Sequence, residues 1–348
     1  ASQFAGSSLM IRTDWLDKLG LKMPTTIDEL TEVLKAFKEK DPGGNGASGA
    51  PLSIDGALAT MVNVTGAFGI ATGWNEQDGK LVPTPLHPGF KDYLTYMSDL
   101  YKQGLLDKEF AVNKDATLKE KFTSGRVGVI PLPWYDIPGI ADALVKNFPD
   151  AKYAYVPALK GDNGQAGLGM NGGFDRITFI PKSAKHPEDA IKWINAKLEK
   201  ETFKLISIGE EGKHFTFKDG VYSPILPLFT DERGLASNYL TGIDEKLYPI
   251  YWQARVQKDL RLFEGFTFLN KEIPAEDRVP DPLAMAPSLP EYSKNNASLN
   301  QMINDFAVKV IVGEESVDEV AAFAEKYNAA GGESSIKEVN DWYASVKK

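Results

Sequence analysis

The residues whose types and spacing best suit ligand chemistry stand in the stretch PLPWYDIPG (131–139). Trp134 and Tyr135 lie there between prolines, after an apolar run (126–132) that predicts a strand and before a predicted helix. Loops at the carboxyl ends of strands are where open α/β sheets bind ligands. The Trp134 ring offers a flat apolar face to a sugar ring, and Asp136 can accept hydrogen bonds from hydroxyl groups. The alternative is a core tryptophan that covers the end of the sheet.

A second candidate set lies in LYPIYWQARVQ (247–257). Tyr248, Trp252 and Arg255 are spaced i, i+4 and i+7, which places them on one stripe of a predicted helix. A buried helix face explains aromatic residues at this spacing more often than a ligand does. Arg255 shifts the balance toward a ligand, because an arginine beside aromatic rings suits a polar or anionic group.

The glycine-rich stretch GMNGGFDR (169–176) lies where the chain is predicted to cross between lobes. It is interpreted either as a ligand-facing hinge loop, with Asn171 as a contact, or as a loop whose glycines permit positive φ.

Catalytic motifs are missing from the sequence. The three histidines are scattered, there is no cysteine, and no metalloprotease, nucleophile-elbow, dinucleotide or phosphate-loop motif occurs. No cofactor and no resident metal are therefore predicted. Carboxylates that are distant in sequence, as in glycosidases, leave a polysaccharide-degrading enzyme open as an alternative.

Composition narrows the class of protein. The chain has 348 residues, 43% of them hydrophobic and 25% charged, which suits a globular protein of two domains. A net charge of -9 without a Lys/Arg cluster argues against nucleic-acid binding.

The periodicity predicts strands that alternate with helices, followed by a helical tail, which is the pattern of α/β layers. The capping box Thr26–Glu29 starts one helix that Pro42 ends, and Lys218-Asp219-Gly220 turns a hairpin over 212–225. The predicted strands are 8–11, 126–132, 152–159 and 175–184. The predicted helices are 14–20, 26–41, 57–68, 89–103, 115–124, 137–147, 186–200, 298–312, 316–329 and 333–346. Little regular structure is expected over 271–297.

Five stretches together resemble a known family, the extracellular solute-binding proteins of carbohydrate ABC transporters (family 1). They resemble more closely the large lipoprotein branch of Gram-positive bacteria, which is similar to alginate-binding proteins. The stretches are LMIRTDWLDKLGLKMPTTIDELTEVLKAFKEKDPGGNG, GVIPLPWYDI, ITFIPKSAKHPEDAIKWIN, GEEGKHFTFKDG and IKEVNDWYAS, and they cover nearly the whole chain in the family's order.

The resemblance implies a two-lobe, periplasmic-binding-protein-like (type II) α/β fold with a helical C-terminal tail. It implies a receptor, not an enzyme, that holds an oligosaccharide between its lobes by aromatic stacking and hydrogen bonds. Trp134 matches the family's aromatic platform, and Tyr248 and Trp252 match an aromatic pair of the alginate-binding branch. The implied partners are ABC permease subunits, and the implied location is the cell surface through a lipid anchor outside this chain, or the periplasm.

The resemblance also implies how the chain is divided. Residues 1–172 correspond mainly to the second (C-terminal) lobe, and residues 173–348 to crossing segments, remaining parts of both lobes and C-terminal helices. Family members begin with a further N-terminal segment, so we expect the first lobe to be incomplete over these residues. A peptide- or amino-acid-binding relative on the same lobes stays open as a further alternative.

The loop DPGGNG that follows the second predicted helix is similar to a calcium loop of many relatives. The matching places keep Asp41 first and Asn45 fifth, but hold Gly43 third, Gly49 ninth and Ala50 tenth. Calcium prefers six or more oxygen ligands, several of them carboxylates. The loop is therefore predicted to be a degenerate site that holds no calcium.

Overall fold

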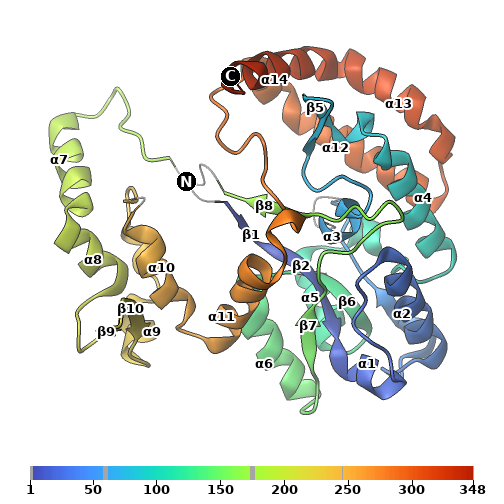
Figure 1. Cartoon of the computed structure of the whole chain (residues 1–348), viewed down its shortest axis with the longest axis horizontal. Coiled ribbons are helices and arrows are strands. Elements are labelled where there is room, and N and C mark those ends of the chain that lie inside the picture. The colour runs from blue at the N-terminus through green and yellow to red at the C-terminus, as the bar shows by residue number, and fades with distance from the viewer. Residues whose placement is uncertain (1–2, 58–61, 173–176, 245, 348) are drawn as a thin grey trace. The chain divides into compact units, whose positions relative to one another are not determined.

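The computed structural model describes residues 3–57, 62–172, 177–244 and 246–347. The chain divides into two compact units (Figure 1). The small unit comprises Gly173–Thr267, and the large unit comprises Ser2–Gly172 and Phe268–Lys348. The assignment of either unit to a lobe stays a prediction.

A four-stranded sheet forms the centre of the large unit, with the strand order β3-β6-β2-β7. Its strands are β3 (Ala50–Leu52), β6 (Val127–Pro133), β2 (Ser7–Arg12) and β7 (Tyr153–Tyr155). Strand β2 pairs antiparallel with both β6 and β7, whereas β3 pairs parallel with β6. Almost every residue of β2 and β6 is buried, so both faces of the sheet are covered.

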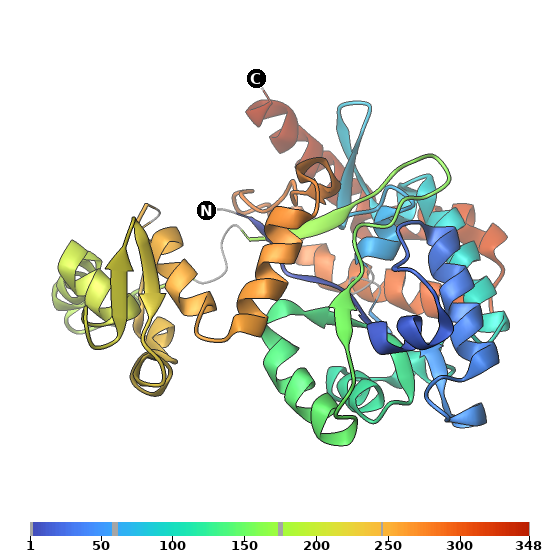
Figure 2. The same ribbon diagram turned by 60° about the horizontal axis from the view of Figure 1, so that its bottom comes forward.

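Two smaller sheets complete the large unit. Strands β1 (Phe4–Ala5), β8 (Leu168–Asn171) and β11 (Arg278–Val279) pair in the order β1-β8-β11. Strands β4 (Trp74–Gln77) and β5 (Lys80–Pro83) form a hairpin, which stands beside the last helix, α14 (Glu333–Val346), in Figure 2.

The helices of the large unit confirm most of the predicted ranges. They are α1 (Thr13–Leu19), α2 (Ile27–Lys40), α3 (Val62–Gly66), α4 (Gly89–Lys102), α5 (Asp115–Thr123), α6 (Ile137–Asn147), α12 (Pro290–Val312), α13 (Val320–Tyr327) and α14. Part of the predicted helix 57–68 lies outside the described residues.

Helix α2 shows why helices of this chain can be predicted from the sequence. The Thr26 hydroxyl accepts a hydrogen bond from the Glu29 amide at 3.1 Å, which satisfies one of the free amides of the first turn. The apolar residues of α2 repeat at helical spacing, and Ile27, Leu30 and Phe37 are buried. The helix ends at Asp41, which adopts a left-handed conformation with φ of 44°.

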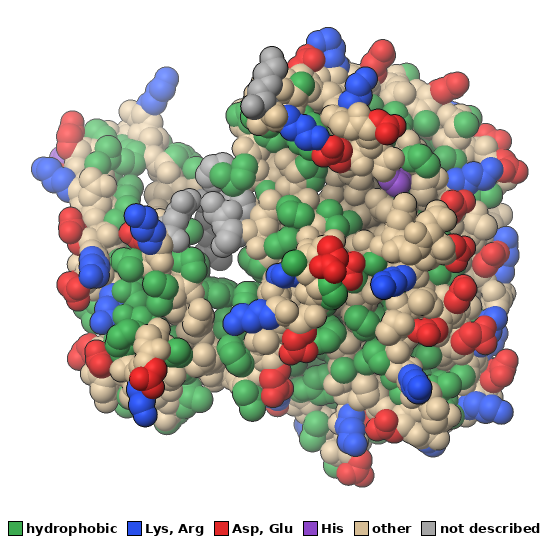
Figure 3. Space-filling model, in the orientation of Figure 1, with side chains coloured by type: hydrophobic (Ala, Val, Ile, Leu, Met, Phe, Trp, Pro, Cys, Tyr) green, Lys and Arg blue, Asp and Glu red, His purple; other side chains and the backbone are tan. Residues whose placement is uncertain are grey.

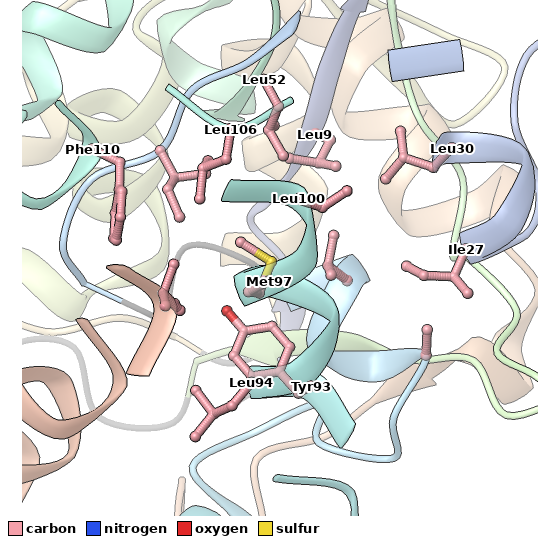
Figure 4. Close-up of a cluster of buried hydrophobic side chains, with 14 of the residues drawn as sticks. Leu9, Ile27, Leu30, Leu52, Tyr93, Leu94, Met97, Leu100, Leu106 and Phe110 are labelled. Atoms are coloured by element: carbon pink, nitrogen blue, oxygen red, sulfur yellow. The ribbon is translucent and has the colours of Figure 1, made fainter. Parts of the chain in front are cut away.

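The main core of the large unit lies between the sheet, α2, α4 and the C-terminal helices. Figure 4 shows Tyr93, Leu94, Met97 and Leu100 of α4 gathered with Leu9 of β2 and with the side chains of neighbouring elements. Helix α12 packs on α4, and Phe306 stacks on Phe323 of α13 with ring centroids 4.1 Å apart. The helical tail is thus part of the core.

The small unit is built around a hairpin and several short helices. Strands β9 (Phe215–Lys218) and β10 (Val221–Pro224) pair as predicted, with Asp219 and Gly220 at positive φ in the turn. Its core includes Phe203, Phe229 and Tyr251. Its helices are α7 (Pro187–Leu198), α8 (Lys200–Ile208), α9 (Leu228–Arg233), α10 (Tyr248–Val256) and α11 (Leu260–Thr267).

Two predictions of secondary structure are wrong: a strand over 175–184, and irregular structure up to residue 297. Among the described residues 177–184, no strand forms, and Ile177 and Phe179 are 77% and 79% exposed. An extended segment needs a paired neighbour to become a strand, and the described residues supply none here. Helix α12 begins at Pro290, inside the segment expected to be irregular, because proline suits the first turn of a helix.

Large apolar side chains are exposed over much of the small unit. Figure 3 shows them on the visible face, and Leu235, Tyr239 and Leu260 are each more than half exposed. Helix α7 has no buried residue at all. Such surfaces on soluble proteins commonly mark interaction sites.

Within the described parts of the chain, no helix has both the length and the apolar character needed to cross a bilayer.

A buried polar network connects Ser53, the residue after β3, with α5 in the large unit. The Lys121 ammonium donates to Asp107 at 2.7 Å and to Asn113 at 3.0 Å, and the Ser53 hydroxyl donates to Asp107 at 2.6 Å. Burial raises the pKa of Asp107, but the hydrogen bonds from Lys121, Ser53 and Asn113 outweigh it, so the pKa is lowered. Removing either partner of the ion pair would leave the other charge buried without its counter-charge.

We predict that Lys121→Met destabilises the protein by about 3–5 kcal/mol at neutral pH, because it leaves the Asp107 carboxylate buried without its cation. Urea denaturation followed by circular dichroism measures the loss. Lys108→Met removes an exposed lysine beside the network and is the matched control, with an expected change of less than about 0.5 kcal/mol. Equal effects of the two substitutions would contradict the assignment.

The same network predicts a pH dependence. The pKa of Asp107 is lowered in the folded state, so its contribution is present above the unfolded pKa of about 3.9 and is lost as the pH falls through the folded value. The stability difference between the parent and Asp107→Asn should be constant above about pH 5 and shrink in more acidic solution. A difference that grew on acidification would have the wrong sign.

Candidate functional site

The turn that follows β6 holds the first candidate set. Residues Trp134–Asp136 form one turn of 3₁₀ helix between the end of β6 and the start of α6 (Figure 1). The Trp134 ring is 6% exposed, while the Tyr135 ring, which meets it edge-on at 5.9 Å, is 61% exposed. Trp134 is thus the buried ring of the turn, and Tyr135 is the ring of the turn that solvent reaches.

Gly6, between β1 and β2, joins two candidates that are far apart in sequence. Its carbonyl accepts a hydrogen bond from the Trp134 amide at 3.1 Å. A Cβ atom on Gly6 would lie 2.8 Å from Nδ2 of Asn171, the exposed last residue of β8. Trp134 and Asn171 therefore flank the same glycine, and a side chain there would push against the Asn171 amide.

The predicted hinge loop 169–176 is described only in part. Asn171 ends β8, and Gly172 has a φ of 139°, a conformation that favours glycine. Residues 173–176 lie outside the described residues.

Asp136 is held by an ion pair that crosses between two helices. The Lys119 ammonium of α5 donates to Asp136 at 2.8 Å and to Asp115 at 2.6 Å. Burial lowers the pKa of Lys119, but the bonds to Asp115 and Asp136 outweigh it, so the pKa is raised. The carboxylate that the sequence offers to sugar hydroxyls is thus anchored to α5.

The second aromatic set lies on α10 in the small unit. The rings of Tyr248 and Trp252 are 5.7 Å apart and tilted by 35°, as the i, i+4 spacing predicts. Tyr248 also packs against the core of the unit, 6.5 Å from Phe203. Both side chains are only partly buried within the small unit.

Arg255 lies on the same stripe but occupies a different environment. Its side chain is 7% exposed and donates to the carbonyls of Ser207, Arg233 and Gly234 at 3.0–3.2 Å. Burial lowers the pKa of its guanidinium. This position favours a structural role, in which Arg255 holds α8, α9 and α10 together.

The calcium-like loop has lost its ligand geometry as well as its acids. Both carboxylate oxygens of Asp41 accept backbone amides, from Asn45 at 2.9 Å and Gly46 at 2.8 Å, and these bonds lower the pKa of Asp41. A Cβ atom on Gly43 would lie 2.8 Å from the Gly125 carbonyl, so the third place leaves no room for a liganding side chain. The residues present do not fit calcium.

Elsewhere among the residues that the structure describes, no group of three His, Cys, Asp or Glu side chains is placed to hold a metal ion.

Sequence reasoning missed Lys119 and Gly6. The spacing of Asp115 and Lys119 predicts an ordinary helical ion pair, but nothing in the sequence places Asp136 beside them. Gly6 carries no motif, and its importance follows from the pairing of β1 with β8 and of β2 with β6.

Comparison with known proteins gives a consistent family and fold. Residues 2–202 match the model of the bacterial extracellular solute-binding protein family. An uncharacterised protein from the butB 5′ region of Niallia circulans is 41% identical over 257 residues, which is 74% of this chain and 100% of that protein. Lipoprotein LipO of Bacillus subtilis is 30% identical over 363 residues, which is 97% of this chain and 69% of LipO.

Among solved structures, the Streptococcus pneumoniae ABC-transporter substrate-binding protein FusA, in complex with kestose, superposes with a TM-score of 0.72. The match covers 99% of this chain and 73% of that chain at 22% identity. It confirms the predicted two-lobe, periplasmic-binding-protein-like fold class.

We predict that calcium does not stabilise the protein, because the Asp41 carboxylate is already bonded to two amides and the third place is blocked. Differential scanning fluorimetry in EGTA, in millimolar magnesium and in millimolar calcium should give equal melting temperatures. Asp41→Ala should lower the melting temperature by the same amount in all three buffers, because the turn loses an acceptor and not a metal. Stabilisation by submillimolar calcium that Asp41→Ala abolishes would overturn this prediction.

Proposed function

Since the chain belongs to the family of bacterial extracellular solute-binding proteins, we propose that it is the substrate-binding receptor of an ABC importer for an oligosaccharide. It binds without catalysis and delivers the sugar to permease subunits. FusA, named as an ABC-transporter substrate-binding protein in complex with kestose, supports a sugar ligand and a transporter partner. LipO, named as a lipoprotein, supports attachment to the cell surface through a lipid anchor.

The turn Trp134–Asp136 is the observation that carries the proposal. Tyr135 presents an exposed ring at the carboxyl end of β6, backed by Trp134. An aromatic face matches the C–H face of a sugar ring, whose hydroxyls then point outward to polar partners. Asn171 lies across Gly6 from the same turn and supplies an amide donor and acceptor.

We assign the Tyr248–Trp252 pair of the small unit as a second stacking surface. Both side chains are partly buried, and Tyr248 packs against the core residue Phe203. Arg255 acts here as a positioning residue, because its three carbonyl bonds hold the helix that carries both rings.

We predict that Tyr135→Ala weakens oligosaccharide binding by about tenfold or more, the usual loss when a central aromatic contact is truncated. Isothermal titration calorimetry against fructo-, gluco-, galacto- and manno-oligosaccharides measures it. Trp134→Ala should also weaken binding, but it removes a buried ring, so its melting temperature must be measured beside its affinity. Trp342→Ala on α14 is the control, and its binding should equal that of the parent.

The enzyme alternative is tested on the same samples. Purified protein incubated with each glycan should release no new reducing ends, while the calorimeter records binding. Turnover of any glycan would contradict a receptor, and unchanged binding in both Tyr135→Ala and Trp134→Ala would contradict the assigned site.

A further inference from the structure

We propose that the Asp115–Lys119–Asp136 cluster beside the aromatic turn selects neutral oligosaccharides against uronate-containing ones. The inference rests on the proposed function, because it takes the turn Trp134–Asp136 as the place where a sugar ring stacks.

The cluster joins one residue of that turn, Asp136, to two residues of α5. Asp136 is the last residue of the turn and precedes the first residue of α6, so its carboxylate lies next to the rings of Trp134 and Tyr135 in the chain. Lys119 reaches it from α5 with a side chain that is 23% exposed, and Asp115 shares the same ammonium. A half-buried pair holds its geometry better than a solvated one, because the lysine is restrained by two partners at once.

The charges of the cluster do not cancel. Two carboxylates and one ammonium leave one net negative charge at neutral pH. Burial raises the pKa of Tyr155, and the negative charge of Asp136 adds to that rise. The Tyr155 hydroxyl donates to the carbonyl of Leu132, in the strand that ends at the turn.

Each unit of a uronate oligosaccharide carries a carboxylate in place of the hydroxymethyl group that the neutral hexose has. A neutral ring that stacks on Tyr135 can donate hydroxyl hydrogens to Asp136. A uronate in the same place brings a second negative charge into a partly desolvated region, where like charges repel more strongly than in water.

Arg255, the cation that the sequence suggests for an anionic ligand, is already hydrogen-bonded within the small unit. Arg255 is buried in the small unit, and its guanidinium donates to three backbone carbonyls and to the Ser237 hydroxyl at 3.3 Å. Presenting it to a carboxylate would break those bonds and leave buried carbonyls without donors.

The experiment measures neutral and acidic trisaccharides in matched pairs by isothermal titration calorimetry at low salt. Kestose is titrated first as a neutral reference. The matched pairs are galactotriose with trigalacturonate, and mannotriose with trimannuronate. We expect at least a tenfold preference for the neutral member of any pair that binds. Raising the salt to 0.5 M should reduce that preference, because screening weakens the repulsion.

Asp115→Asn tests the charge itself. It removes the outer carboxylate, whose side chain is 69% exposed, and leaves the Lys119–Asp136 pair. We expect the neutral preference to fall at least threefold, through a gain in affinity for the uronate member of each pair. Asp150→Asn makes the same change in net charge beyond the far end of α6, and the preference should not change. A merely structural cluster would instead alter the melting temperature and leave the preference unchanged.

The outcomes separate the two proposals. Uronates that bind as tightly as their neutral partners, with Asp115→Asn without effect, would overturn the inference and leave a sugar receptor. Binding of no oligosaccharide of either kind by the parent would overturn the proposed function, and the inference with it.

Discussion

Strand β2 hydrogen-bonds β6 on one side and β7 on the other, and its register with β6 determines where the aromatic turn lies. Ser7 pairs with Pro133, so the next amide along the chain, that of Trp134, meets the carbonyl of Gly6. A slip of one residue would turn Leu9 and Ile11 out of the main core. The loss of their burial disfavours any other register. The position of the candidate site is thus a consequence of core packing.

How far the sequence predicts the fold depends on whether the signal is local. Helix α2 has its cap, its apolar stripe and its stop within one segment, and the prediction is confirmed almost to the residue. The hairpin β9–β10 likewise contains its own turn. Segment 177–184 has the alternating apolar pattern of a strand, yet a strand also needs a partner, and the pattern says nothing about which residues supply one.

The candidate site divides in the same way. Trp134, Tyr135 and Asp136 can be found from sequence because an aromatic pair and an acid follow an apolar run. Lys119 cannot be found, because its bond to Asp136 joins α5 to the turn before α6. For Arg255 the sequence leaves two environments open. A helical stripe of Tyr, Trp and Arg looks the same whether the arginine meets a ligand or caps carbonyls, and only its 7% exposure separates the two.

Three aspartates show how one side chain acquires different roles from its surroundings. Asp107 is buried and held by a lysine inside the unit, so its charge contributes to stability. Asp41 is bonded to amides four and five residues on, so its charge maintains a turn and is poorly available to a metal. Asp136 lies in the turn after β6, next to the exposed Tyr135 in the chain, and shares the ammonium of Lys119 with a second acid, Asp115. Because Asp136 belongs to the proposed stacking turn, it is the one of the three that we expect to act on a ligand, and this expectation follows from position rather than from residue type.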